Sequence, residues 1–142
     1  KKIFKNIYFL GMVRNPYAQV EGIIRRNNAT LEYAAQFALK CLRLQKKNKE
    51  FEINSLFITY EELCDNNEEV IGKIKLFIPE LGDLDSDLEF SAHNFKTDGK
   101  MKVQNLNNEK IKKLSKNQLA LINSYFNKEV ELLNYFGYSI IN

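Results

Sequence analysis

The hydrophobic pattern begins with a short apolar run at residues 7–13, IYFLGMV, which is rich in residues that favour β-strands. A nearly continuous apolar run of this length is typical of a strand buried on both faces, as in a parallel sheet. Asn15 and Pro16 follow and predict a helix start, because Asn caps the first N–H groups and Pro suits the first helical position. The apolar face of this helix, expected to end at about Arg26, consists of Tyr17, Val20, Ile23 and Ile24.

A second, longer helix is predicted from about Thr30 to Lys47, because apolar and small residues recur there at helical spacing. The small residues of its stripe suggest close packing against a sheet. Another short apolar run, SLFITY at 55–60, predicts a second strand, and a helix from about Glu68 to Phe77 ends before Pro79. The stripe of the longer helix is Leu31, Ala34, Ala35, Ala38, Cys41, Leu42 and Gln45, with Phe37 and Leu44 alongside.

The remaining pattern predicts a long loop followed by two helices. Residues 79–106 show no strong period, and a loop of this length inside a domain is usually functional or mobile. Helices are expected at about Asn107–Leu114 and Lys116–Phe136, with Gly137 placed to cap the last one.

The order of elements is strand, helix, helix, strand, helix, loop, helix, helix, which is an α/β arrangement. Two buried strands joined through helices should run parallel with a right-handed connection. Two strands do not form a self-sufficient sheet. We therefore expect residues 1–142 to be the second half of a larger three-layer domain whose preceding strands lie outside this sequence.

Composition and charge exclude several classes of function. The 142 residues include 21 Lys and Arg against 18 Asp and Glu, a net charge of +3 that is too small to indicate nucleic acid as the main partner. No apolar run is long enough to span a membrane. Cys41, Cys64 and the single His93 show no spacing of a disulfide framework or metal site, so no metal is expected.

Arg14 is the main candidate for chemistry. It comes one residue after the first strand, and open parallel sheets bind ligands beyond the carboxyl ends of their strands. The free N–H groups of a helix start and a guanidinium together predict an anion site, with a phosphate as the natural ligand. The alternative is a salt bridge from Arg14 to a loop carboxylate.

Gly22 lies two turns further along the same helix. Glycine in a helix interior costs roughly 0.8–1.0 kcal/mol relative to alanine, so this position needs a reason. Close packing against the helix at 30–47 is the favoured explanation from the residues alone, and space beside a ligand is the alternative.

Tyr60, at the end of the second strand, can contact a ligand or pack in the core. Glu61 and Glu62 suit the first turn of a helix, where negative charge is stabilising, and we expect them to be structural rather than catalytic. In the loop, Lys96, Lys100 and Lys102 lie around Gly99; these lysines can close over a phosphate or remain solvated.

These features occur in the order found in the C-terminal part of a sulfotransferase domain, the family that uses 3′-phosphoadenosine-5′-phosphosulfate (PAPS) as donor. The resemblance covers almost the whole chain. It rests on four segments: VRNPYAQVEGIIRR, LFITYEELCDN, VIGKIKLFIPELG and EVELLNYFGYSI.

The resemblance implies a P-loop-type fold and sulfuryl transfer from PAPS to a hydroxyl or amine. It places Arg14 on the 3′-phosphate of the donor and Tyr60 near its adenine. Gly22 stands where family members often carry a serine that also binds this phosphate. The family's Arg-Lys-Gly loop has no match, and Lys96 and Lys100 are its loose substitutes here.

The family's glycine-rich phosphate loop and catalytic base lie upstream of the arginine motif, and only 13 residues precede Arg14. We therefore expect the parent protein to be the enzyme and this chain alone to be inactive, with the missing N-terminal portion as its partner. The acceptor, a sugar, a peptide or a small alcohol, cannot be read from these residues.

Two other functions remain open. The first is a non-enzymatic α/β interaction module that kept the fold without donor binding, and the weaker second is a nucleotide kinase. The abundance of Lys, Asn and Ile, with no visible signal segment, favours a microbial cytoplasmic protein, with a Golgi-luminal parent as the alternative.

Overall fold

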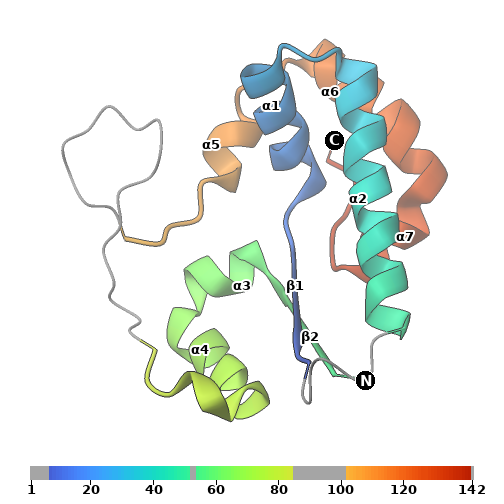
Figure 1. Ribbon diagram of the computed structural model, residues 1–142. Coiled ribbons are helices and arrows are strands. Elements are labelled where there is room, and N and C mark those ends of the chain that lie inside the picture. The colour runs from blue at the N-terminus through green and yellow to red at the C-terminus, as the bar shows by residue number, and fades with distance from the viewer. Residues whose placement is uncertain (1–6, 52–53, 85–101, 142) are drawn as a thin grey trace.

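A computed structural model describes residues 7–51, 54–84 and 102–141, and shows a mixed α/β arrangement that is mostly helical (Figure 1). Strands β1 (Phe9–Val13) and β2 (Ser55–Thr59) pair in parallel, as predicted, with Phe9 opposite Ser55. Gly11 faces Phe57 in this register, and an added Cβ would overlap the Phe57 ring. Any side chain at Gly11 would therefore have to displace this ring.

Helix α1 (Pro16–Asn27) starts as the sequence predicts. The Asn15 side chain accepts hydrogen bonds from the N–H groups of Tyr17 and Ala18, and Pro16 occupies the first turn. The helix ends where Asn28 adopts a left-handed conformation with φ of 48°.

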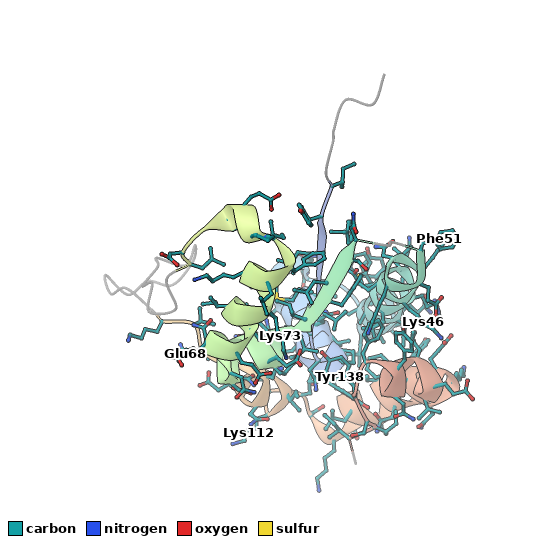
Figure 2. The ribbon with its side chains drawn as sticks, turned by 90° about the horizontal axis from the view of Figure 1, so that it is seen from below. Lys46, Phe51, Glu68, Lys73, Lys112 and Tyr138 are labelled. Carbon is teal, nitrogen blue, oxygen red and sulfur yellow. The ribbon has the colours of Figure 1, made fainter. Side chains whose placement is uncertain are left out.

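Helix α2 (Leu31–Phe51) extends four residues beyond the predicted end at Lys47, to Phe51 (Figure 2). The added turn contains Lys49 and Glu50, which are good helix formers, and Lys46 pairs with Glu50 across one turn at 3.9 Å. The small residues of α2 are fully buried, but the helix packs mainly on α1 and α6 and less on the strands. The predicted close packing against the sheet is therefore only part of their role.

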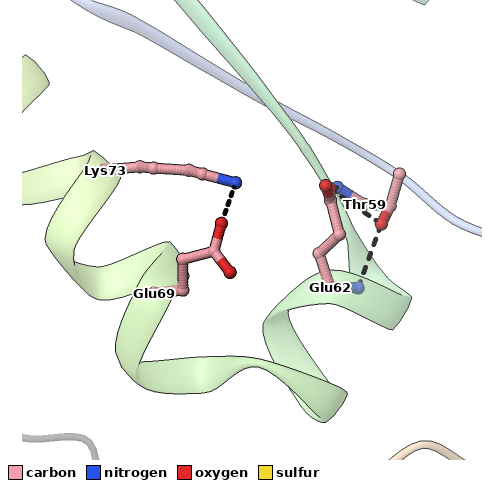
Figure 3. A network of polar contacts seen from close by, with 4 residues as sticks. All are labelled: Thr59, Glu62, Glu69 and Lys73. Carbon is pink, nitrogen blue, oxygen red and sulfur yellow. Dashed lines mark hydrogen bonds and ion pairs between the residues drawn. The ribbon is translucent and has the colours of Figure 1, made fainter.

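Two helices follow β2 without a loop, α3 (Tyr60–Asp65) and α4 (Asn67–Phe77). The prediction that the strand includes Tyr60 is wrong by one residue, because a capping box begins the helix there. Glu62 N–H donates to Thr59 Oγ1 at 3.0 Å, and Thr59 N–H donates to Glu62 Oε2 at 2.9 Å (Figure 3). These bonds confirm a structural role for Glu62, and they hold the pKa of its carboxyl below the usual value.

The 3₁₀ turn η1 (Pro79–Leu81) opens the predicted loop, and most of that loop lies outside the described residues. The C-terminal part then comprises α5 (Asn107–Ile111), α6 (Lys116–Phe126), η2 (Asn127–Glu129) and α7 (Val130–Tyr135).

The single helix predicted at Lys116–Phe136 is therefore wrong, since the 3₁₀ turn η2 divides it, and α5 ends three residues before the expected Leu114. The predicted cap at Gly137 is confirmed. This glycine has φ of 79°, and the next N–H, that of Tyr138, donates to the Leu133 carbonyl at 3.0 Å.

The strands lie between helices on both sides, with α2, α6 and α7 on one side and α3 and α4 on the other (Figure 1). The larger core joins α1, α2, α6 and α7 around fully buried Tyr17, Ile122 and Phe126. A smaller core of Ile58, Val70 and Ile74 joins β2 to α4.

Strand β1 keeps apolar side chains in solvent although its sequence resembles that of a buried strand. Leu10 is 44% exposed and Met12 is 49% exposed, and β2 is the one strand paired with β1 in the described ranges. Among the helices that the structure describes, none combines the length and apolar character needed to cross a membrane.

Candidate anion site

Arg14 leaves the end of β1 and points its guanidinium between two other elements. Its Nε donates to Asn107 Oδ1 of α5 at 2.7 Å, and its central carbon lies 4.1 Å from the centre of the Tyr60 ring of α3. The Nη2 atom is buried and has no hydrogen-bond partner among the described residues. Among the described residues, Arg14 therefore binds the Asn107 amide and not the loop carboxylate that the salt-bridge alternative required. The N–H groups of its Nη2 remain available to a further acceptor.

Glu61 organises the groups around Arg14. Its carboxylate accepts from the Asn15 N–H at 2.8 Å, from the Tyr138 hydroxyl at 3.0 Å and from the Asn107 side-chain amide. Burial, and next the neighbouring Glu61 carboxylate, raise the pKa of Tyr138 above its usual value. Glu61 therefore ties α3 to the start of α1, to α5 and to the C-terminal segment, which confirms its predicted structural role.

Tyr60 contributes its ring to the site and its hydroxyl to the scaffold. The hydroxyl donates to the Gln104 carbonyl at 2.7 Å and accepts from the Leu106 N–H at 3.4 Å, so it anchors the segment that leads into α5. Burial raises the pKa of this hydroxyl. The structure thus brings Tyr60 against Arg14 from the second strand–helix junction, as the position of both residues after parallel strands predicts.

The start of α1 offers fewer free N–H groups than the sequence suggests. Asn15 itself takes the N–H groups of Tyr17 at 3.0 Å and Ala18 at 3.5 Å, and the Asn15 N–H donates to Glu61. The expectation of free backbone donors beside Arg14 is therefore wrong at these three positions. Any anion here depends mainly on side chains.

A cavity of about 350 Å³ opens between α1, α2 and α5. Its lining combines positive charge with apolar surface, and it contains one acidic residue, Glu21. The cations are Arg14, Arg25, Arg26 and Lys110, and the apolar residues include Ala18, Ile23, Phe37 and Cys41.

Gly22 lies in the wall of this cavity. A Cβ added to Gly22 would meet no described atom within 4 Å, so the favoured prediction of close packing against α2 is wrong. The glycine instead leaves open space in the wall of the cavity that Arg14 also lines, and space beside a ligand stays a prediction.

Gly22→Ala is expected to raise the free energy of unfolding by about 1 kcal/mol, because alanine favours the helix and the new methyl group meets open space. Urea unfolding followed by circular dichroism measures this change. The matched control is Gly137→Ala, which should destabilise the protein because φ at Gly137 is 79°. Destabilisation by Gly22→Ala would contradict the open cavity wall.

Lys110 is a site residue that the sequence does not single out. The lysines at 108–116 suggest a solvated helix face, but Lys110 lines the cavity together with Arg14. Burial lowers the pKa of Lys110, and the nearby positive charge of Arg25 lowers it further. Lys110 lies three residues after Asn107, and residues three apart share one face of a helix. Asn107 was itself identified only through its hydrogen bond to Arg14, so the sequence carried no direct signal for either residue.

The other predicted phosphate ligands, Lys96, Gly99 and Lys100, lie outside the described residues, as does His93. Within the described ranges, no cluster of three or more His, Cys, Asp or Glu side chains could hold a metal ion. Cys41 lines the cavity, and burial raises the pKa of its thiol.

No protein-family model matches the chain, and neither curated proteins nor solved structures give a match. The function must therefore follow from the residues and their geometry.

Proposed function

We propose that this chain supplies the 3′-phosphate and adenosine side of a PAPS site in a sulfotransferase of the P-loop type. One observation carries the proposal. Arg14, held by Asn107 and stacked on Tyr60, lines a cationic cavity beyond the carboxyl end of a parallel strand.

The charges of the cavity suit a phosphate. A phosphate oxygen is best held by charge-assisted donors, and a guanidinium presents several in a fixed plane. Arg14 has one donor committed to Asn107 and one buried donor without a described partner, and Lys110 adds a second cation from α5. In this proposal Lys110 contributes to the phosphate contact that the resemblance gives loosely to Lys96 and Lys100.

The cavity also suits the nucleoside of the donor. Phe37 is 41% exposed and lines the cavity beside Ile23, so an apolar surface is available to a base. Stacking on an aromatic side chain contributes binding energy for any of the bases, because every base has a π-face. The Tyr60 ring is already covered by Arg14, so in this proposal it orients the guanidinium.

The exposed apolar residues of β1 support a larger parent domain. Leu10 and Met12 would be buried if a further parallel strand and its helix packed against β1. Such an addition would give a larger sheet between two layers of helices. That further portion would carry the phosphate loop and the catalytic base. In sulfuryl transfer, negative charge grows on the sulfonyl and bridging oxygens and must meet positioned donors. This chain then binds the donor nucleotide but transfers no sulfuryl group alone.

Arg14→Ala is expected to weaken binding of 3′,5′-adenosine bisphosphate about 10-fold to 100-fold, the range for hydrogen bonds to charged groups. Isothermal titration calorimetry measures the affinity. The matched control is Arg43→Ala, because Arg43 lies away from the cavity and pairs with Glu129 at 2.7 Å. Equal affinity of the Arg14→Ala variant and the unchanged protein would contradict the site assignment.

The second candidate is a non-enzymatic interaction module, and the exposed apolar side chains of β1 favour it independently of any nucleotide. An absence of nucleotide binding, together with a stable complex with a partner protein, would support this function instead. Sulfotransferase activity after addition of the missing portion would exclude it.

A further inference from the structure

Two buried polar atoms without described partners belong to residues that line the same cavity. One is the donor Arg14 Nη2, and the other is the acceptor Glu21 Oε2. Glu21 is only 6% exposed, and its other carboxylate oxygen accepts from Arg25 Nε at 3.0 Å. Buried polar atoms in native proteins almost always have a partner, either a protein group or an ordered water, so this donor and this acceptor are available to a molecule in the cavity.

Arg14 and Glu21 line the same cavity. Glu21 lies on one face of α1 with Ala18, Gly22 and Arg25, and all four residues line the cavity. Lys110 lines the same cavity. Burial, and next the positive charge of Arg25, lower the pKa of Lys110, whereas the Glu21 carboxylate raises it. The absence of a side chain at Gly22 leaves open space beside Glu21.

A fully ionised anion cannot satisfy both groups, because it would bind Arg14 but be repelled by the Glu21 carboxylate. Hydrogen phosphate carries a hydroxyl donor, but its other oxygens bear the negative charge that Glu21 repels. The ligand must present an anion to Arg14 and a hydrogen-bond donor to Glu21. A ribose 3′-phosphate has this chemistry, because the neighbouring 2′-hydroxyl is a donor next to the phosphate.

We infer that Glu21 accepts a hydrogen bond from the ribose 2′-hydroxyl beside the phosphate that Arg14 holds, and so makes the cavity specific for ribonucleotides. This inference rests on the proposed function and adds to it a residue that determines specificity. The four cations that the described residues bring to the cavity offset the repulsion between the Glu21 carboxylate and an anionic ligand.

A chemical double-mutant cycle tests the inference. Calorimetry with the 142-residue chain compares 3′,5′-adenosine bisphosphate, its 2′-deoxy analogue and inorganic phosphate. For the unchanged protein, the deoxy analogue should bind about tenfold more weakly, the lower range for a hydrogen bond to a charged group. For Glu21→Ala, which removes both acceptor oxygens, the affinities for the two nucleotides should differ by less than about twofold, and phosphate should bind no more weakly than before.

Arg25→Gln is the matched control. It removes the ion pair of Glu21 and one cation of the cavity but keeps the carboxylate. All three ligands should therefore bind more weakly to this variant, while the tenfold preference for the ribonucleotide should remain. A merely structural role of Glu21 would change the affinities for both nucleotides alike.

The outcomes separate the two proposals. If neither nucleotide binds, both the proposed function and the inference are overturned. If both nucleotides bind equally to the unchanged protein, or if the preference survives in Glu21→Ala, the inference alone is overturned and the phosphate site remains.

Discussion

Glu61→Ala is expected to lower the free energy of unfolding by about 3 kcal/mol or more, since hydrogen bonds to charged groups contribute about 1.5–3 kcal/mol each. The Glu61 carboxylate accepts three donors from three separate segments. Two of these donors belong to Asn107, 5% exposed, and Tyr138, 8% exposed, and would be left without their acceptor. Urea unfolding followed by circular dichroism measures the loss.

The matched control for this substitution is Glu69→Ala. Glu69 is 66% exposed at its side chain and makes a surface ion pair with Lys73 at 2.8 Å, so its removal should change stability little (Figure 3). Glu61→Ala should also weaken nucleotide binding, because Asn107 would lose the partner that fixes its contact with Arg14. Similar stability of the two variants would show that the Glu61 network contributes nothing.

Phe126→Ala is expected to lower the free energy of unfolding by about 3–5 kcal/mol, the usual cost of deleting a buried aromatic side chain. Phe126 is fully buried in the larger core, and its ring meets that of Tyr17 edge to face with centroids 4.9 Å apart. Removing it leaves a cavity where α6 packs on α1. The midpoint of urea unfolding should fall accordingly.

Phe51→Ala makes the same chemical change at a solvent position. Phe51 is 74% exposed at the outer end of α2, and Figure 2 shows it at the periphery of the molecule. Its truncation should alter the free energy of unfolding by less than about 0.5 kcal/mol. Equal losses for the two phenylalanines would contradict the assignment of Phe126 to the core.

Local interactions explain which elements could be predicted. Asn15 and Pro16 begin α1 through bonds to the next residues, and Gly137 ends α7 through its own backbone conformation. Such signals lie within four residues of the feature that they determine. The parallel strands followed from their apolar runs and the helices between them.

The errors arose where distant contacts decide. The apolar stripe at 116–136 has a continuous helical period, so no local signal marked the 3₁₀ turn η2 (Asn127–Glu129). In the folded chain, Glu129 of this turn accepts from Arg43 of α2 at 2.7 Å. Gly22 was likewise ambiguous, because spacing within α1 cannot tell whether a neighbouring helix or an open cavity faces it.

The sequence alone determined that an arginine follows an apolar strand at the start of a helix, because strand, cap and helix are all encoded by adjacent residues. The predicted burial of this strand on both faces was wrong, since Leu10 and Met12 are exposed. Only the tertiary structure decided what surrounds that arginine. Asn107 lies 93 positions from Arg14, and Tyr138 lies 77 positions from Glu61, yet both make direct hydrogen bonds. Packing of whole helices sets these distances, and it also brings Glu21 and Lys110 into one cavity with Arg14.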